Sequence, residues 1–220
     1  MAQVLKNKEI PQLESWGLLA ALFALEFIAY LIFYFSRKAF FPSLPIDFLD
    51  FEVKVFTYLS IFLFCMIRYG KITFEELLPT RKDILLLSIA VVIILWIFGL
   101  FIGPERIRNP RHEIFKSFAP LYYWFSLFIV VGLAPFFEEA IFRRYFLEIQ
   151  HQYYSTSTSV LITAGVATLF HFDSSENLIA ILLWTFFIQT VFGLLYVKGR
   201  LVVSVLAHMF VNGLVMLLSK

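Results

Sequence analysis

This chain alternates long apolar stretches with short polar segments, and the alternation restricts its fold more than any other feature does. The stretches approach the roughly 20 apolar residues that an α-helix needs to cross a bilayer. We therefore expect an all-α fold, a polytopic bundle of about seven transmembrane helices. The predicted spans are Trp16–Phe35, Val53–Tyr69, Ile84–Ile102, Pro120–Phe137, Ser159–Phe172, Leu178–Val197 and Leu201–Leu218.

Composition supports lipid as the solvent of this chain. Of its 220 residues, 60% are hydrophobic and 15% are charged, against about 25% charged in an ordinary soluble domain. A soluble protein of this size cannot bury so much apolar surface. The net charge of +2 gives no indication of nucleic-acid binding. Cys65 is the only cysteine, which excludes an intrachain disulfide and a four-cysteine metal site.

Polar features suggest how the chain is placed in a membrane. Basic pairs such as Arg37-Lys38 and Arg81-Lys82 flank apolar stretches, as expected of loops at a membrane surface. The distribution of these basic residues favours a cytoplasmic N-terminus. The first span has no signal-peptide pattern. The expected location is a prokaryotic plasma membrane. We expect one domain over residues 1–220, with 1–116 as scaffold and 117–218 as the functional core.

Two adjacent glutamates, Glu138 and Glu139, directly follow the fourth apolar stretch. An ionisable group at membrane depth is costly and therefore suggests function. Glu139 and Arg143 are four residues apart, so on a helix they share a face and can pair. Glu138 points about 100° away round the helix, so it does not share this pairing with Arg143. In the structural alternative, Pro135 begins a surface helix whose first turn holds both glutamates.

Three further polar residues lie in the last apolar stretches. His171 ends the fifth predicted span, and His208 and Asn212, four residues apart, share a face of the last span. Each could simply join helices through hydrogen bonds. Glu26, in the middle of the first span, has no partner at helical spacing and is not assigned to catalysis.

Geometry brings these groups to one depth. If the fourth helix continues to about Gln150 and the chain turns within residues 151–157, the fifth helix returns antiparallel. Glu138 and His171 then both lie roughly 25 Å from the turn at 1.5 Å per residue. His208 also lies several residues inside its span.

A carboxylate and an imidazole can hold and deprotonate a water, while a second histidine and an amide can bind an oxyanion. This set suits peptide-bond hydrolysis in a buried cavity, with no cofactor required. The alternative is zinc, which Glu138, His171 and His208 could bind while leaving a fourth position open. The sequence has no His-Glu-x-x-His helix.

The run Glu138-Glu139-x-x-x-Arg143, the histidine at residue 171 and His208-x-x-x-Asn212 resemble the CAAX-protease and bacteriocin-processing family (CPBP, or Abi) of intramembrane endopeptidases. The resemblance covers about residues 132–218. It implies a hydrolase in which Glu138 activates water with help from His171. His208 and Asn212 would form the oxyanion pocket, and Glu139 and Arg143 would support the site.

One position departs from the family pattern, because Ala167 stands where an aromatic residue would precede His171 by four. The substitution either weakens packing or opens room for substrate. The expected substrate is a membrane-anchored or lipidated protein or peptide. The competing hypotheses are a non-catalytic membrane binding, immunity or scaffolding protein with a protease-like fold, and a proton-coupled carrier that uses Glu26, Glu138 and the histidines.

Overall fold

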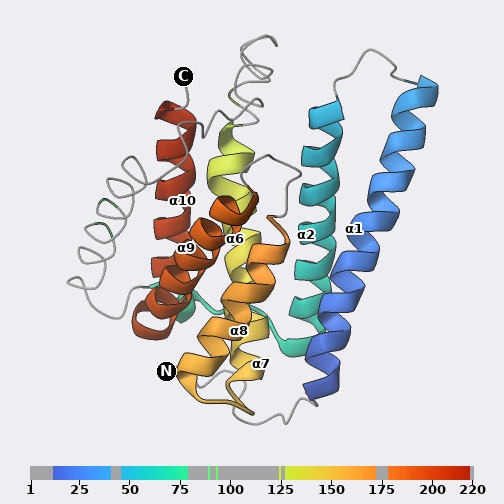
Figure 1. Cartoon of the computed structure of the whole chain (residues 1–220). Helices are drawn as coiled ribbons and strands as arrows, with labels where there is room; N and C mark the ends of the chain where they lie inside the picture. The colour runs from blue at the N-terminus through green and yellow to red at the C-terminus, as the bar shows by residue number, and fades with distance from the viewer. Residues whose placement is uncertain are drawn as a thin grey trace.

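The computed structural model describes residues 12–40, 46–78, 127–171 and 178–218, together with the isolated positions 89, 93 and 124. All regular structure in these ranges is helical, and they contain no strand. Figure 1 shows the helices side by side as a bundle. In chain order they are α1 (Gln12–Phe40), α2 (Ile46–Tyr69), η1 (Phe74–Leu77), η2 (Ile129–Leu133), α6 (Ala134–Glu139), η3 (Ala140–Leu147), α7 (Glu148–Gln150), α8 (Thr156–Leu169), α9 (Leu178–Gly199) and α10 (Leu201–Leu218).

The first two helices form an antiparallel pair along one side of the bundle (Figure 1). Both predicted spans are confirmed as helices, and each extends beyond its predicted start. Their shared face buries Leu22 and Cys65, which are 0% exposed, so Cys65 is a core residue. The third predicted span, Ile84–Ile102, lies outside the described residues apart from positions 89 and 93.

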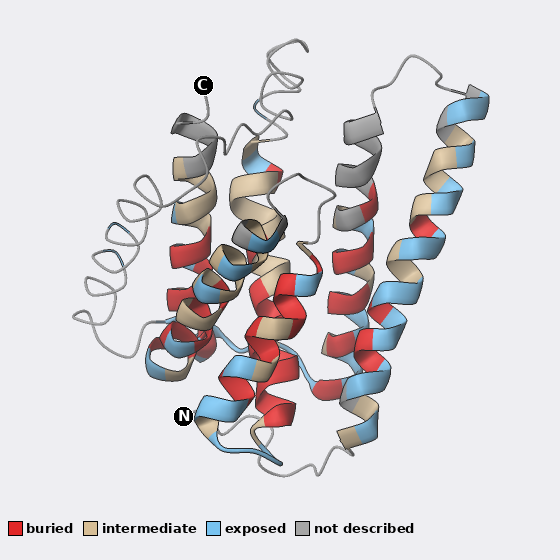
Figure 2. Ribbon diagram, in the orientation of Figure 1, coloured by how far each residue is buried: buried red, intermediate tan, exposed pale blue. Residues whose placement is uncertain are grey.

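The central element is a continuous helical run from η2 through α7. Its first and third segments have the wider π-helical turn, and α6 between them is α-helical. Residues 139–150 of this run are all buried, and Figure 2 shows them in the middle of the bundle. The run ends at Gln150, as the sequence predicts, and so carries polar side chains through the centre of the fold.

The chain then turns and packs α8 against α9. Ser155 begins α8 as its N-cap, because its side chain accepts a hydrogen bond from the Thr158 amide. Gly193 permits the close approach of α8 and α9, since a Cβ at this position would lie 2.9 Å from Cγ1 of Val160. Helix α10 follows α9 and packs against both α9 and the central run.

The short 3-10 helix η1 is attached to the bundle core by charged groups. Arg144, fully buried in η3, pairs with Glu76 across 2.9 Å. Arg200, between α9 and α10, donates to the carbonyl of Glu75 at 2.6 Å. These contacts fix the segment that follows α2 against the C-terminal helices.

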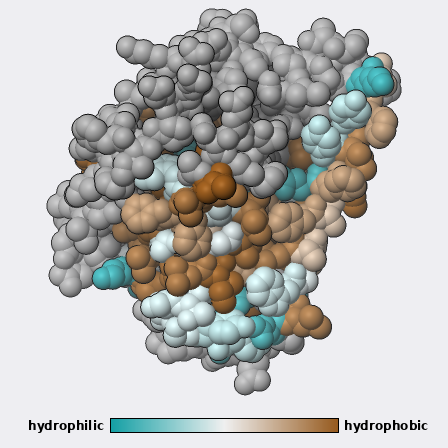
Figure 3. Space-filling model, viewed as in Figure 1, coloured by the Kyte–Doolittle hydropathy of each residue, from teal (hydrophilic) through white to brown (hydrophobic). Residues whose placement is uncertain are grey.

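Two of the described helices contain stretches long and apolar enough to cross a membrane, Gln12–Ser36 and Ile181–Gly199. Shorter apolar helical stretches occur at Val55–Tyr69, Thr156–Leu169 and Leu201–Leu214. Apolar side chains also gather across the middle of the face in Figure 3, with polar ones toward its lower end. The all-α fold is confirmed, and the number of spans, seven, stays a prediction.

Candidate active site

The two adjacent glutamates lie in the last turn of α6, in the middle of the central run. Glu139 is 1% exposed, and the Glu138 side chain is 13% exposed. Pro135 does lie near the start of α6, yet it is buried and the helix continues from η2. The alternative of a surface helix beginning at Pro135 is therefore wrong.

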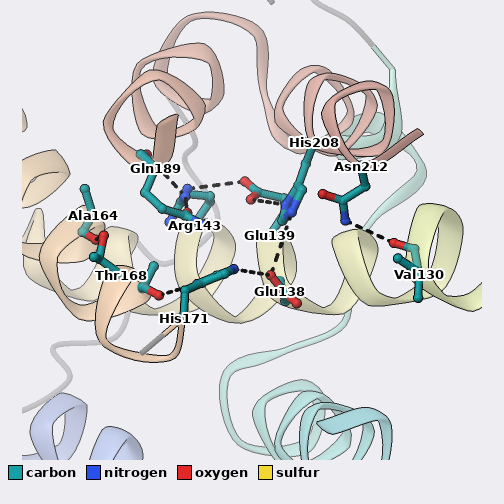
Figure 4. Close-up of polar contacts among 11 residues, drawn as sticks. Val130, Glu138, Glu139, Arg143, Ala164, Thr168, His171, Gln189, His208 and Asn212 are labelled. Carbon is teal, nitrogen blue, oxygen red and sulfur yellow. Dashed lines mark hydrogen bonds and ion pairs between the residues drawn. The ribbon is translucent and has the colours of Figure 1, made fainter. Parts of the chain in front are cut away.

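Glu139 has charged and polar partners that hold it in place. Its Oε2 lies 3.2 Å from Nε of Arg143, one turn later, as the spacing predicted. Arg143 in turn donates from Nη2 to the backbone carbonyl of Gln189 at 3.2 Å and to that residue's side-chain oxygen. Because Gln189 belongs to α9, this buried chain of contacts joins the central run to α9 (Figure 4).

His208 of α10 is oriented from two sides. Its Nδ1 lies 3.0 Å from Oε1 of Glu139, and its ring stacks on Phe192 with centroids 4.8 Å apart. A carboxylate accepts hydrogen bonds, so Nδ1 carries the hydrogen when Glu139 is ionised. The other ring nitrogen, Nε2, is directed at Glu138 across 3.8 Å.

His171 lies just after α8 and is oriented in the same way. Its Nδ1 lies 2.9 Å from the carbonyl of Ala167, which can only accept, so Nδ1 is the donor. Its Nε2 lies 3.9 Å from Oε2 of Glu138. Ala167 itself is 0% exposed and packs in the same cluster as Phe142 and Phe170, so its small side chain faces packed atoms and opens no room for a substrate.

Three groups therefore converge on one point, as the depth argument predicted. Nε2 of His171 and Nε2 of His208 both face Oε2 of Glu138 (Figure 4). This oxygen is buried and accepts no hydrogen bond from the described residues. Separations of 3.8 and 3.9 Å exceed a direct hydrogen bond and suit a bridging water. Such a water would touch a carboxylate and two oriented imidazoles.

The same three side chains were the predicted zinc ligands. Their donor types suit zinc, and the Glu139 carboxylate would orient the ring of His208 through Nδ1, as carboxylates commonly do for zinc-binding histidines. Ligand atoms on a tetrahedral zinc lie roughly 3.3 Å apart, given bonds of about 2.0–2.1 Å, so the observed spacing is wider than zinc requires. Accordingly, the described residues contain no cluster of three or more histidine, cysteine, aspartate or glutamate side chains with metal-site geometry.

Asn212 lies one turn beyond His208 on α10 and is engaged elsewhere. Its Nδ2 donates to the carbonyl of Val130, in η2, at 3.0 Å. Figure 4 shows the nitrogen end of this amide turned toward Val130. The predicted role of Asn212 in an oxyanion pocket therefore depends on the second hydrogen of the same nitrogen, because an amide NH₂ has two donors.

Two residues of the site region have no signal in the sequence. Gln189 holds Arg143, yet a glutamine in an apolar helix is ordinary by its sequence alone. Tyr58 of α2 is 4% exposed, and its hydroxyl lies within electrostatic reach of both Glu138 and Glu26. Both contacts join helices far apart in the sequence, and helical periodicity carries no information about them.

Residues 120–214 match the family model described as type II CAAX prenyl endopeptidase Rce1-like. No curated protein and no solved structure matches the chain significantly. The matched segment contains all six residues that the sequence motifs singled out, from Glu138 to Asn212, and leaves α1, α2 and η1 outside. Residues 120–214 of this chain are therefore similar to the Rce1-like type II CAAX prenyl endopeptidases.

Proposed function

We propose that this protein is an intramembrane endopeptidase that hydrolyses a peptide bond in a membrane-anchored protein or peptide, by means of a water activated by Glu138. The observation that carries the proposal is the convergence of His171 and His208 on the buried Oε2 of Glu138, which has no hydrogen-bond donor of its own among the described residues. A water in this position would supply the missing donor.

In the proposed reaction the water oxygen attacks the carbonyl carbon while Glu138 takes the proton that the water loses. His171 assists by accepting the water's second hydrogen bond at Nε2, since its Nδ1 is committed to Ala167. Collapse of the tetrahedral intermediate breaks the carbon–nitrogen bond, and Glu138 returns the proton to the leaving amine. The products are a new carboxyl terminus and a new amino terminus.

His208 is the proposed electrophilic partner. With both nitrogens protonated, it would donate from Nε2 to the oxyanion while Glu139 balances its charge through Nδ1. Arg143 and Gln189 would keep Glu139 in position for this task. An oxyanion contact from Asn212 stays a prediction.

The proposed substrate approaches from the side of His171. That side chain is 33% exposed, whereas Glu138 is 13% and His208 is 6% exposed. The description of the matched family is type II CAAX prenyl endopeptidase, so a protein anchored by a prenylated cysteine is the first substrate class to test. Zinc held by Glu138, His171 and His208 remains the alternative source of an activated water.

The first experiment compares protein termini in membranes of cells that express wild type or Glu138→Gln at equal abundance, by terminal-peptide mass spectrometry. Glutamine keeps the shape of the side chain and cannot accept the proton. New termini found only with wild type would support a peptidase and identify its substrates. Identical profiles under several growth conditions would instead favour a non-catalytic binding protein.

A direct assay uses a quenched fluorescent peptide whose CAAX-type tail carries an S-farnesyl cysteine, in liposomes with the purified protein. Its matched control is the same peptide without the farnesyl group. Cleavage of both peptides at equal rates would reject prenyl recognition while retaining the peptidase. Cleavage by folded Glu138→Gln or His171→Ala at the wild-type rate would reject the proposed mechanism.

A further inference from the structure

The central run begins with a break in its own hydrogen bonding. In η2 the amide of Ala134 donates to the carbonyl of Ile129, five residues earlier. The next bond in this register would run from residue 135 to the carbonyl of Val130. Residue 135 is proline, which has no N–H to donate.

The carbonyl of Val130 therefore lacks its helical donor at a part-buried position of the bundle. A helix carbonyl deprived of its partner inside an apolar environment costs free energy unless another group replaces the donor. In this structure the replacement is a side chain, because Nδ2 of Asn212 donates to the Val130 oxygen at 3.0 Å. The reverse orientation of the amide would set two acceptors against each other, so the nitrogen must face Val130.

We infer that Asn212 is a positioning residue, which replaces the missing N–H of Pro135 and thereby fixes the junction of η2 and α6 against α10. The inference rests on the proposed function, because it assigns Asn212 an action through Glu138. It differs from an oxyanion contact, since the amide acts on the backbone of the enzyme rather than on the substrate.

The consequence for the site follows from the path of the chain. Glu138 lies three residues after Pro135 within the short helix α6. His208 lies one turn before Asn212 on α10. From neighbouring turns of α10, the Asn212–Val130 bond therefore holds η2 and the His208–Glu139 bond holds the end of α6. Together they set the distance between Oε2 of Glu138 and Nε2 of His208.

The test is a double-mutant cycle of Asn212→Ala and Pro135→Ala. The Pro135→Ala variant restores a backbone N–H that can donate to Val130, so it makes the asparagine dispensable. Each purified variant is assayed in liposomes with the farnesylated quenched peptide, and its melting temperature is measured in parallel. Assays are run well below every melting temperature.

We expect Asn212→Ala alone to lower kcat by about tenfold to 100-fold with KM little changed, because a small displacement of a catalytic group has effects of this size. In the Pro135→Ala background the same substitution should change kcat by less than about threefold. The loss in melting temperature should also largely disappear in that background, as expected of coupled sites.

Two results would overturn the inference. If kcat stays about 100-fold or more below that of Pro135→Ala in the double variant, Asn212 acts on the reaction itself, as an oxyanion donor does. If Asn212→Ala lowers the melting temperature equally in both backgrounds, the proline does not create the demand for its amide. If wild type fails to cleave the peptide, the proposed function fails with this substrate. The melting temperatures of the four proteins in the double-mutant cycle still test whether Asn212 replaces the N–H that Pro135 lacks.

Discussion

The N-terminal helix pair and the C-terminal helices each contain an apolar stretch long enough to cross a membrane, yet their charged pairs lie in different environments. In α1 and α2 the described ion pair is Glu14–Arg68, whose side chains are 26% and 42% exposed. In the C-terminal part Glu139 and Arg143 are 1% and 0% exposed and are paired inside the bundle. The burial of these ion pairs therefore distinguishes the two regions.

The two ion pairs differ in the free energy of desolvation, which is large only for the buried Glu139–Arg143 pair. A buried ion pair gains less than it loses in desolvation unless further hydrogen bonds hold it, and here His208 and Gln189 provide them. The N-terminal pair needs no such support because water solvates its ends. The match to the Rce1-like family begins only at residue 120. The buried Glu139–Arg143 pair therefore lies inside the matched segment, and the exposed Glu14–Arg68 pair lies outside it.

The largest expected effect separates the two regions by activity. Glu138→Gln should lower kcat by about 10²–10⁴-fold, the range that general-base catalysis contributes, with little change in melting temperature. The matched control is Glu14→Gln in α1, which neutralises a partly exposed carboxylate outside the site and should leave cleavage of the farnesylated peptide unchanged. An equal loss of activity in both variants would show that the site is not confined to the C-terminal part.

The second expected effect concerns stability. Arg143→Met should lower the free energy of unfolding by about 3–5 kcal/mol, because it leaves the buried Glu139 charge without its partner. Arg68→Met breaks an exposed pair and should cost at most about 1 kcal/mol. Denaturant titration in detergent micelles measures both values. Equal losses would mean that burial of the ion pair does not govern its contribution.

The third expected effect compares glycines in the two regions. Gly193→Ala should destabilise the α8–α9 contact by about 1–3 kcal/mol, because its Cβ would overlap Val160. Gly17→Ala in α1 meets no atom within 4 Å and should be neutral or stabilising by up to about 1 kcal/mol. Thermal unfolding of the two variants decides the sign of each. A stable Gly193→Ala variant would show that α8 can shift without cost.

The smallest expected effect is that of chelation on the Glu138-dependent reaction. Because Glu138 and the histidines can activate water without a metal, dialysis against a strong chelator should change kcat by less than about twofold. Loss of activity that zinc restores would instead assign Glu138, His171 and His208 as ligands. Glu14→Gln again serves as the control, since it lies outside the site.

Much of the site could be predicted from the sequence because its signals are local or depend on length. The Glu139–Arg143 pair follows from a four-residue spacing. The approach of His171 to Glu138 follows from counting residues to the turn after Gln150. Asn212 was found as a site residue by its spacing from His208, but its contact with Val130 was not.

What the sequence by itself determined about this protein is its helical nature and the candidate set of Glu138, His171 and His208, whose spacing along the helices predicts that they approach one another. The tertiary structure decided which atoms meet: Nε2 of each imidazole at Glu138, Gln189 at Arg143 and Glu76 at Arg144. Helical periodicity fixes the face on which a residue lies, but the neighbour of that face depends on how distant helices pack. That packing is set by contacts such as Gly193 against Val160, which no local spacing encodes.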